Sequence, residues 1–344
     1  MEMSKRFSSR FQIDGVGVGE DCPAYLIAEA GVAHFGSVEK AFRLVDMAVE
    51  AGADAVKFQI FDTDALIGRE AAAWRERLSS RCLPYDDFYR VRDYCDDKNI
   101  TFFATAHDEP SLDFLDELKV PVHKIGSGEV DNWPFISKVA GRGKPVILST
   151  GMYTFEKITK ALDVVFEAGN REVVVLHCVT NYPSPPDEIN LRVMDAIREA
   201  FDVVTGYSDH TAGIYIPLAA IARGARVLEK HISLDFNVPD AQDWKVSCGP
   251  EDLPELIRGA REIEASLGSG ERVPNSAELE SILWARKSLV TRKAMKAGDE
   301  LTLDVLAFKR PGTGIPPSDA EKVVHRRINI DLESDTVIQW EHLN

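Results

Sequence analysis

The sequence predicts a TIM (β/α)8 barrel, a closed ring of eight parallel strands surrounded by helices, followed by a small β-rich domain. Eight strand-like runs alternate with helical segments over about 250 residues, a pattern typical of this barrel. After Gly270 the pattern changes to short alternating strands, and 344 residues can hold one large barrel and a small domain. The alternative is an open doubly wound sheet. It usually has fewer strands, and GVAHFG at 31–36 is not the glycine fingerprint of its dinucleotide-binding form.

The elements follow in order from local patterns. Residues 11–20 alternate apolar and small side chains around glycines, which predicts a hairpin ahead of the barrel. The first barrel strand is the apolar run 24–30, as expected for a buried parallel strand. Residues 37–50 carry apolar side chains at helical spacing, and Gly52 follows as a C-terminal cap. The other predicted strands are 54–59, 101–106, 123–127, 145–150, 172–178, 203–208 and 227–232. Helical segments such as 155–167 and 191–201 follow them, and after the last strand a long loop precedes the helix at 251–267.

These patterns divide the chain into domains. We expect a barrel domain with its hairpin at 1–270, a polar linker with a short helix at 271–285, and a β-rich domain at 286–344. The run KSLVTR, the turn KAGDE and the Pro/Gly-rich segment KRPGTGIPP characterise the last domain. It has about 60 residues, too few to bury a large core alone, so we expect it to dock on a barrel.

Composition limits the classes of partner. The chain is 44% hydrophobic and 28% charged, as in ordinary globular proteins. Its net charge of −16 argues against nucleic acid or an anionic membrane as partner, so a local cluster of Lys, Arg or backbone N–H groups must hold any anionic substrate. The N-terminus lacks the apolar core of a signal peptide, and no run is long enough to span a bilayer. The five scattered cysteines contain no CxxC pair, so we expect reduced thiols and a cytoplasmic location.

Two histidines suggest a metal site. His210 and His231 each follow a β-branched apolar run, and one helix-length crossover separates them. Neutral imidazole is a common ligand of divalent transition metals, so the pair predicts a metal site, although two unrelated strand-end histidines are the alternative. We expect the remaining barrel histidines to be structural: His34, His107, His123 and His177.

Polar residues also end the other predicted strands, where TIM barrels place their active sites. They are Glu29, Lys57, Gln59, Thr105, Lys124, Ser127, Ser149, Tyr182 and Ser208. Buried Lys and Glu are costly unless they are paired or bind a ligand. Lys57 and Lys124, with nearby hydroxyls, therefore predict a site for a phosphate or phospho-carboxylate, and Glu29 is a candidate acid/base or substrate-orienting group. Alternatively, a lysine pairs with a structural carboxylate, Glu29 being the obvious partner, and the hydroxyls satisfy loop backbone.

These residues closely resemble the sialic acid synthase family, phosphoenolpyruvate-dependent synthases of nine-carbon sugar acids. The matching barrel motifs are IAEAG (27–31), AGADAVKFQ (51–59), KIGSGE (124–129), KPVILSTGM (144–152), LHC…YP (176–183), GYSDHT (206–211) and LEKHISLD (228–235). KSLV (287–290) and KRPGTGIPP (309–317) resemble the family's C-terminal antifreeze-like (SAF) domain. The resemblance covers nearly the whole chain in the family's order.

The resemblance implies a transferase that condenses phosphoenolpyruvate with an N-acylmannosamine-type aldehyde. C3 of the enol attacks the aldehyde, water adds at C2, and phosphate leaves. The residues implied to bind phosphoenolpyruvate are Lys57, Thr105, Lys124, Ser127, Ser149 and Ser208. His210 and His231 would hold Mn²⁺, or Mg²⁺ or Co²⁺, as a Lewis acid. The residues implied to contact or orient the sugar are Glu29, Gln59, Tyr182, Asp243 and, from the partner of a domain-swapped homodimer, Arg310. Glu29, Lys57 and the two histidines would be the catalytic residues.

Three departures from the family pattern concern the sugar. Ala33 replaces an expected Asn, Thr180-Asn181 is unusual, and Trp244 follows Asp243 in a changed loop at 236–247. We therefore expect retained chemistry with an altered or relaxed acceptor. N-acetylmannosamine, its 6-phosphate and a 2,4-diacetamido-dideoxy sugar leading to legionaminic or pseudaminic acid all remain open. Other classes to weigh are a Schiff-base aldolase using Lys57 or Lys124, and a non-catalytic sugar-binding protein.

Overall fold

The chain forms two compact units, Met1–Gly268 and Ser269–Asn344. The structure is a computed structural model that describes residues 6–239 and 241–344. No helix in these two ranges is both long and apolar enough to cross a membrane.

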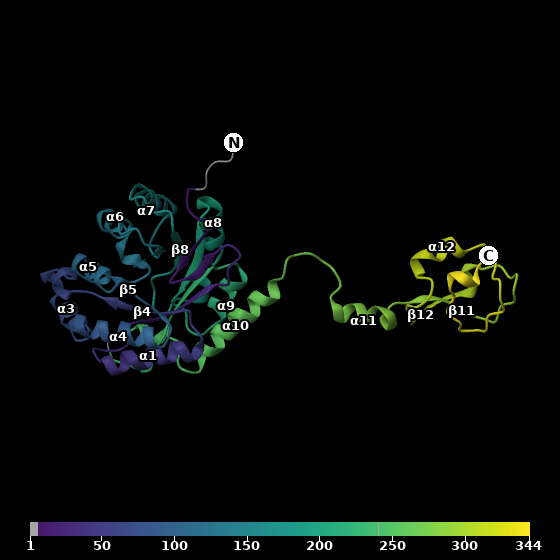
Figure 1. Ribbon diagram of the computed structural model, residues 1–344, viewed down its shortest axis with the longest axis horizontal. Coiled ribbons are helices and arrows are strands. Elements are labelled where there is room, and N and C mark those ends of the chain that lie inside the picture. The colour runs from purple at the N-terminus through teal and green to yellow at the C-terminus, as the bar shows by residue number, and fades with distance from the viewer. Residues whose placement is uncertain (1–5, 240) are drawn as a thin grey trace. The chain divides into compact units, whose positions relative to one another are not determined.

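The first unit is a closed barrel of eight parallel strands, which confirms the predicted TIM barrel (Figure 1). Strands consecutive in sequence are neighbours, and the last strand closes the ring against the first. The strands are β3 Tyr25–Gly31, β4 Ala55–Ile60, β5 Thr101–Ala106, β6 His123–Ile125, β7 Val146–Ser149, β8 Val173–Cys178, β9 Val204–Asp209 and β10 Val227–His231. They differ from the predicted ranges only at their ends. The largest difference is in β6, which stops at Ile125 because a 3-10 helix, η2 Ser127–Glu129, begins two residues later.

Helices surround the barrel. They are α1 Val38–Ala51, α4 Tyr85–Asp97, α5 Glu109–Glu117, α6 Trp133–Ala140, α7 Phe155–Glu167, α8 Arg192–Phe201, α9 Tyr215–Ala222 and α10 Asp252–Leu267. Helix α1 shows how the sequence sets such an element. The Ser37 side chain caps its first turn by accepting from the Lys40 N–H, and Gly52 ends it with a φ of 81°, which glycine adopts without strain. Leu44 and Val45 on its inner face are fully buried, each contributing about 1.5–3 kcal/mol through removal from water.

A segment of short helices between β4 and α4 was not predicted. It contains α2 Thr63–Leu66, a 3-10 helix η1 Arg69–Ala71 and α3 Ala72–Ser79. None of the side chains of α3 is buried, so the segment lacks the apolar stripe by which an amphipathic helix is recognised. Residues from this segment form one wall of the cavity described below.

The hairpin ahead of the barrel is present as β1 Arg10–Ile13 and β2 Val16–Gly19, paired antiparallel. Its inward side chains Ile13 and Val18 are fully buried. Asp14, in the turn, accepts a 3.1 Å hydrogen bond from Thr101 at the start of β5. The hairpin therefore packs at the N-terminal end of the barrel, away from the strand ends where the predicted site residues lie.

The second unit has a small core of its own. Its elements are α11 Ser276–Ala285, β11 Ser288–Thr291, η5 Leu303–Val305, β12 Leu306–Lys309, η6 Pro317–Asp319, α12 Ala320–Val323 and η7 Trp340–His342. Strands β11 and β12 pair antiparallel. The core comprises Leu289, Leu301, Ile315, Val323, Ile328 and Ile338, among other buried residues.

Candidate active site

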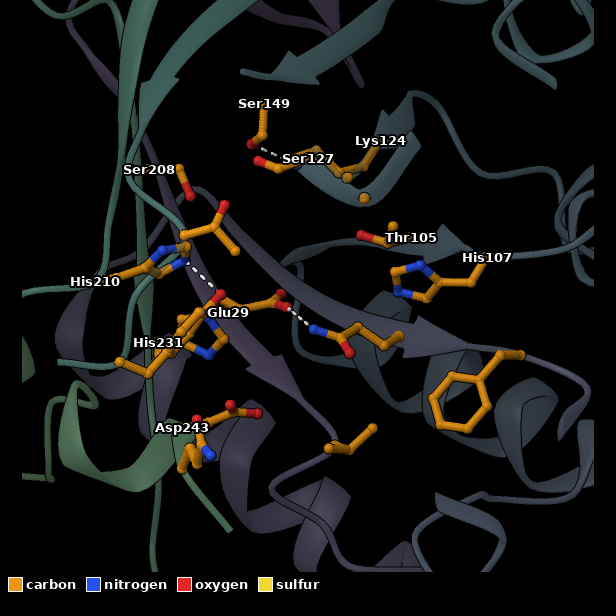
Figure 2. Close-up of a pocket in the computed structure, with 18 of the residues that line it drawn as sticks. Glu29, Thr105, His107, Lys124, Ser127, Ser149, Ser208, His210, His231 and Asp243 are labelled. Atoms are coloured by element: carbon orange, nitrogen blue, oxygen red, sulfur yellow. Dashed lines mark hydrogen bonds between the residues drawn. The ribbon is translucent and has the colours of Figure 1, made fainter. Parts of the chain in front are cut away.

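A cavity of about 610 Å³ opens at the C-terminal ends of the barrel strands (Figure 2). All twelve barrel residues predicted for the site line it: Glu29, Lys57, Gln59, Thr105, Lys124, Ser127, Ser149, Tyr182, Ser208, His210, His231 and Asp243. The thirteenth, Arg310, belongs to the second unit, where its guanidinium lies 5.7 Å from the centroid of the Trp284 ring. Its predicted contact with the sugar stays a prediction.

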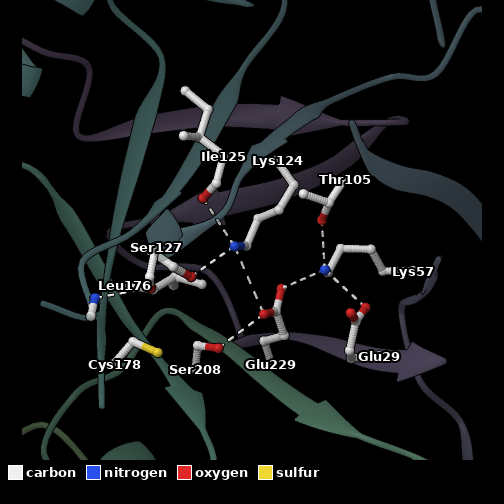
Figure 3. A network of polar contacts seen from close by, with 12 residues as sticks. Glu29, Lys57, Thr105, Lys124, Ile125, Ser127, Leu176, Cys178, Ser208 and Glu229 are labelled. Atoms are coloured by element: carbon white, nitrogen blue, oxygen red, sulfur yellow. Dashed lines mark hydrogen bonds and ion pairs between the residues drawn. The ribbon is translucent and has the colours of Figure 1, made fainter. Parts of the chain in front are cut away.

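Lys57 of β4 projects into the barrel and is almost fully buried. Its Nζ lies 2.8 Å from Glu29 Oε2 and donates to Thr105 Oγ1 at 2.9 Å (Figure 3). Gln59, two residues along the same strand, donates to the other Glu29 oxygen at 2.8 Å. Strand side chains alternate between faces, so Lys57 and Gln59 share the inner face and hold Glu29 between them. Glu29 is thus the partner of Lys57, as the alternative interpretation expected.

Lys124 of β6 is the second buried lysine. Its Nζ donates to Ser149 Oγ at 2.7 Å and to the Ile125 carbonyl at 3.1 Å. Ser127 follows on η2, and its Oγ accepts from the Gly151 N–H at 3.0 Å. A side chain at Gly151 would place its Cβ 2.1 Å from Thr180 Oγ1, so only glycine permits this approach.

Glu229 of β10 is a charged site residue that the sequence analysis missed. Its Oε2 lies 3.6 Å from Lys57 Nζ and its Oε1 lies 3.9 Å from Lys124 Nζ. Figure 3 marks both contacts with dashed lines. Ser208 donates to Oε1 at 2.9 Å. Glu229 precedes His231 by two residues and therefore faces the same side of the strand. This two-residue alternation of side chains along a strand is the sequence signal that could have identified Glu229.

Burial and neighbouring charges together set the protonation states of the cluster formed by Glu29, Lys57, Lys124 and Glu229. Burial raises the pKa of Glu29 to about 7, a shift that Lys57 opposes and Glu229 reinforces. Burial alone would also raise the pKa of Glu229, but Lys124 and Lys57 overcome it and lower that pKa below its usual value. For Lys57, its two carboxylate neighbours outweigh burial and raise its pKa, whereas burial prevails at Lys124 and lowers its pKa. At neutral pH the cluster therefore contains a charged Lys57 and Glu229 and a Glu29 that can readily gain or lose a proton.

The two predicted metal ligands lie side by side on the opposite wall from Lys124 and Thr105 (Figure 2). The His210 and His231 ring centroids are 5.4 Å apart. His210 Nδ1 lies 2.7 Å from the Val179 carbonyl, which fixes the tautomer that leaves Nε2 as an acceptor. That Nε2 is 2.8 Å from the Tyr182 hydroxyl. Burial, reinforced by the nearby lysines, lowers the pKa of His231 well below its usual value, so its ring is neutral, as a metal ligand must be.

The geometry of this pair fits a shared ion. An imidazole nitrogen binds such metals at about 2.1 Å, so two rings sharing one ion have centroids roughly 5 Å apart. In the described ranges, no group of three or more His, Cys, Asp and Glu side chains is arranged to hold a metal. Two protein ligands would leave coordination positions open to substrate and water, as catalytic metal sites require.

The structure revises several expectations about the cavity wall. His107, expected to be structural, lines the cavity two residues beyond Thr105. His177 is a core residue bonded to the Ile189 carbonyl at 2.7 Å, as expected. Of the departures placed near the sugar, Ala33 and Trp244 do not line the cavity. Trp244 instead donates to the Val238 carbonyl at 3.1 Å within its own loop.

The β4–α4 segment adds a further wall that the sequence analysis did not include. It contributes Phe61, Leu66, Ile67, Trp74, Arg77, Leu78 and Arg81. The cavity therefore joins a charged inner part, built on the barrel strands, to an outer part with mainly apolar and arginine side chains.

The fold and site define an enzyme of the TIM-barrel class with its polar residues gathered at the strand ends. Comparison with known proteins identifies the family. The model of the NeuB family matches residues 44–272, and that of the SAF domain matches 286–344. The chain belongs to the NeuB family, which confirms the resemblance to sialic acid synthases.

Named relatives and solved structures agree with this assignment. The chain is 36% identical to the N,N'-diacetyllegionaminic acid synthase of Legionella pneumophila, over 94% of this chain and 96% of that protein. It is 33% identical to human N-acetylneuraminate-9-phosphate synthase, over 95% and 94%. The crystal structure of N-acetylneuraminic acid synthetase from Leptospira borgpetersenii, in complex with citrate, superposes with a TM-score of 0.75 and 32% identity, over 80% of this chain and 96% of that one. The protein is therefore an enzyme of a family of sugar-acid synthases.

Proposed function

We propose that this enzyme condenses phosphoenolpyruvate with an N-acyl hexosamine aldehyde, in a metal-dependent reaction that yields a nine-carbon sugar acid and phosphate. One observation carries the proposal. Two buried lysines with hydroxyl partners face two adjacent histidines across a single cavity. A trianionic substrate needs the first group, and activation of an aldehyde is served by the second.

The inner part of the cavity supplies the binding groups for phosphoenolpyruvate. Lys57 and Lys124 provide cationic donors, and the hydroxyls that complete the set are Thr105, Ser127, Ser149 and Ser208. The lysines pair with Glu29 and Glu229, which hold the cationic groups in place for an anion. Such preorganised charge stabilises a bound anion without reorganisation during the reaction.

His210 and His231 would hold the divalent metal, with Mn²⁺ as the proposed ion and Mg²⁺ or Co²⁺ as substitutes. Bound there, the metal would act as a Lewis acid toward the aldehyde oxygen. The Val179 carbonyl orients His210 for this role by accepting from its other ring nitrogen.

The remaining residues handle protons and the acceptor. C3 of the enol forms the new bond to the aldehyde carbon, water adds at C2, and the C2–O bond to phosphate breaks. Protons balance, because the added water loses two: one goes to the aldehyde oxygen, and the other goes to the departing phosphate as the C2 carbonyl forms. Glu29, whose pKa of about 7 permits either protonation state, is suited to exchange a proton with the acceptor. Gln59, Tyr182 and Asp243 line the same region and would orient the sugar hydroxyls.

The acceptor is proposed as an N-acetylmannosamine-type sugar. A 2,4-diacetamido-dideoxy sugar is the leading alternative, since a relative at 36% identity is named as a legionaminic acid synthase, and a 6-phosphate acceptor is another. We also propose a domain-swapped homodimer in which Arg310 enters the partner's barrel. The five free cysteines support a reducing, cytoplasmic location.

A phosphate-release screen tests the proposal. The purified enzyme is incubated with phosphoenolpyruvate, Mn²⁺ and each candidate sugar, with omission of each component in turn as control. We expect phosphate only when all three are present, and mass spectrometry should show a product containing the acceptor and three added carbons. Release of phosphate without a sugar, or none with any N-acyl hexosamine, would contradict the assignment.

A further inference from the structure

A buried ion pair lies directly behind the two histidines, on the other side of the barrel wall. Asp209 ends β9 and Lys230 is the next-to-last residue of β10, and the two are opposite each other in the parallel register. Both side chains are fully buried, and Lys230 Nζ is bonded to Asp209 Oδ2. Lys230 packs among residues of α10, including Leu253 and Leu256, so the pair faces the helix layer and not the cavity.

The pair also holds the residue that follows His210. Lys230 Nζ donates to the Thr211 carbonyl at 2.7 Å. The Thr211 hydroxyl in turn donates to Asp209 Oδ1 at 2.9 Å. Asp209 and Thr211 are the two chain neighbours of His210, and Lys230 is a chain neighbour of His231. One ammonium group therefore bonds the side chain that precedes the first histidine and the backbone carbonyl that follows it, from a position adjacent to the second histidine.

The buried Asp209–Lys230 pair is better suited to orienting its neighbouring residues than to stabilising the fold. Removing two charges from water is expensive, and well-packed apolar residues at such a place are often neutral or stabilising. Apolar residues could fill the same space beside α10, but they could not bond the Thr211 carbonyl. The bond from Lys230 to Thr211 ties the segment after β9 to β10, which carries the other histidine.

We propose that Asp209 and Lys230 are positioning residues that hold His210 and His231 at the spacing needed to share a divalent metal. The inference rests on the proposed metal site. Residues that orient metal ligands from behind typically change metal affinity 10- to 100-fold when they are mutated.

The test compares metal affinity with stability in the full-length, metal-free protein. Mn²⁺ binding is followed by the EPR signal of the free ion, and unfolding by thermal denaturation. We expect Lys230→Met and Asp209→Asn to weaken Mn²⁺ binding by about 10-fold or more. The matched control is Arg261→Met, which breaks the 2.9 Å Asp54–Arg261 ion pair at the opposite end of the barrel. It should lower the melting temperature without changing Mn²⁺ affinity.

A double variant separates positioning from stability. Asp209→Leu/Lys230→Met removes both charges and should recover stability relative to the single variants. We expect its Mn²⁺ affinity to stay low because the bond to Thr211 is still missing. Recovery of affinity together with stability, or wild-type affinity in the single variants, would overturn the positioning role. A wild-type protein that binds no Mn²⁺ would instead overturn the metal site itself, and the positioning role with it.

Discussion

Glu229 bridges the two barrel lysines, with one carboxylate oxygen 3.6 Å from Lys57 Nζ and the other 3.9 Å from Lys124 Nζ. Both lysines are buried, and neither would keep its charge at low cost without a nearby carboxylate. The carboxylate therefore maintains the cationic groups that the anionic substrate needs.

Replacing this carboxylate should damage substrate binding in a pH-dependent way. In Glu229→Gln, Lys124 loses the strongest of the neighbours that raise its pKa, so it should lose its proton at lower pH. We expect kcat/KM for phosphoenolpyruvate to fall about 100-fold, or roughly 3 kcal/mol, and its alkaline limb to move to lower pH. Ser208→Ala removes only one hydrogen bond to Glu229 and serves as the control, with a smaller loss. An alkaline limb that stays in place in Glu229→Gln would contradict this role.

Glu29 should make stability depend on pH. Its pKa rises from 4.5 to about 7 on folding, mainly because of burial. A carboxyl with a raised pKa stabilises the folded state below its unfolded pKa, and this contribution is lost as pH rises to about 7. The free energy of unfolding of the wild type, relative to Glu29→Gln, should therefore fall by roughly 1 kcal/mol per pH unit between pH 5 and 7 and then level off. Denaturant titrations at pH 5, 6, 7 and 8 measure it, and parallel curves for the two proteins would refute it.

Metal removal should abolish turnover. We expect dialysis against a chelator to stop phosphate release and Mn²⁺ to restore it. His210→Gln and His231→Gln should each weaken Mn²⁺ binding at least 100-fold, because only two protein ligands are proposed. His107→Gln is the matched control, since His107 lines the cavity near Thr105 on the other wall and should leave Mn²⁺ affinity unchanged. Full activity in a chelated, metal-free sample would exclude the metal-dependent reaction.

Experiments on Lys124 can distinguish anion binding from Schiff-base chemistry. Burial lowers the pKa of Lys124, which is the property that a nucleophilic lysine needs. If the proposed function is correct, borohydride treatment with substrates should trap no adduct, and Lys124→Arg should retain more affinity for phosphoenolpyruvate than Lys124→Met. Mass spectrometry of the treated protein measures the first outcome. A substrate adduct on Lys124 would favour an aldolase.

The proposed domain-swapped dimer predicts complementation between two inactive variants. The His231→Gln variant has a defective barrel site but keeps Arg310. The Arg310→Ala variant keeps an intact barrel site but lacks the side chain that would enter the partner's barrel. After mixing and subunit exchange, half of the dimers are mixed, and each mixed dimer has one complete site of two, so about a quarter of wild-type activity should return. Activity that stays at the level of the separate variants would show that Arg310 does not act in the partner's barrel.

Much of the barrel and its site could be predicted from the sequence, because parallel strands bring their C-terminal ends to one face. Lys57 and Lys124 are far apart in the chain, yet both were expected in one site and both contact Glu229. Glu229 itself was missed because only the last polar residues of each strand were considered, whereas β10 turns two polar side chains inward. His107 was instead considered and expected to be structural, although it lies just past the end of β5 and lines the cavity.

The conformations of the loops could be predicted less well from the sequence than the barrel strands. Trp244 was expected near the sugar, but its indole is bonded to Val238 within its own loop, a choice that periodicity cannot reveal. The helices of the β4–α4 segment were also absent from the prediction, because α3 buries none of its side chains. Hydrophobic pattern identifies only those helices that pack against a core.

The same segment has a consequence for how this enzyme could be altered. Trp74 and Arg77 line the cavity from a helix that contributes nothing to the barrel core, and Trp74 is 53% exposed. Substitutions at such positions usually change stability by no more than about 0.5 kcal/mol. The barrel strands that hold the charged groups, by contrast, tolerate little change. Substitutions in this one segment can therefore reshape the cavity wall while the strands that carry the charged groups stay unchanged.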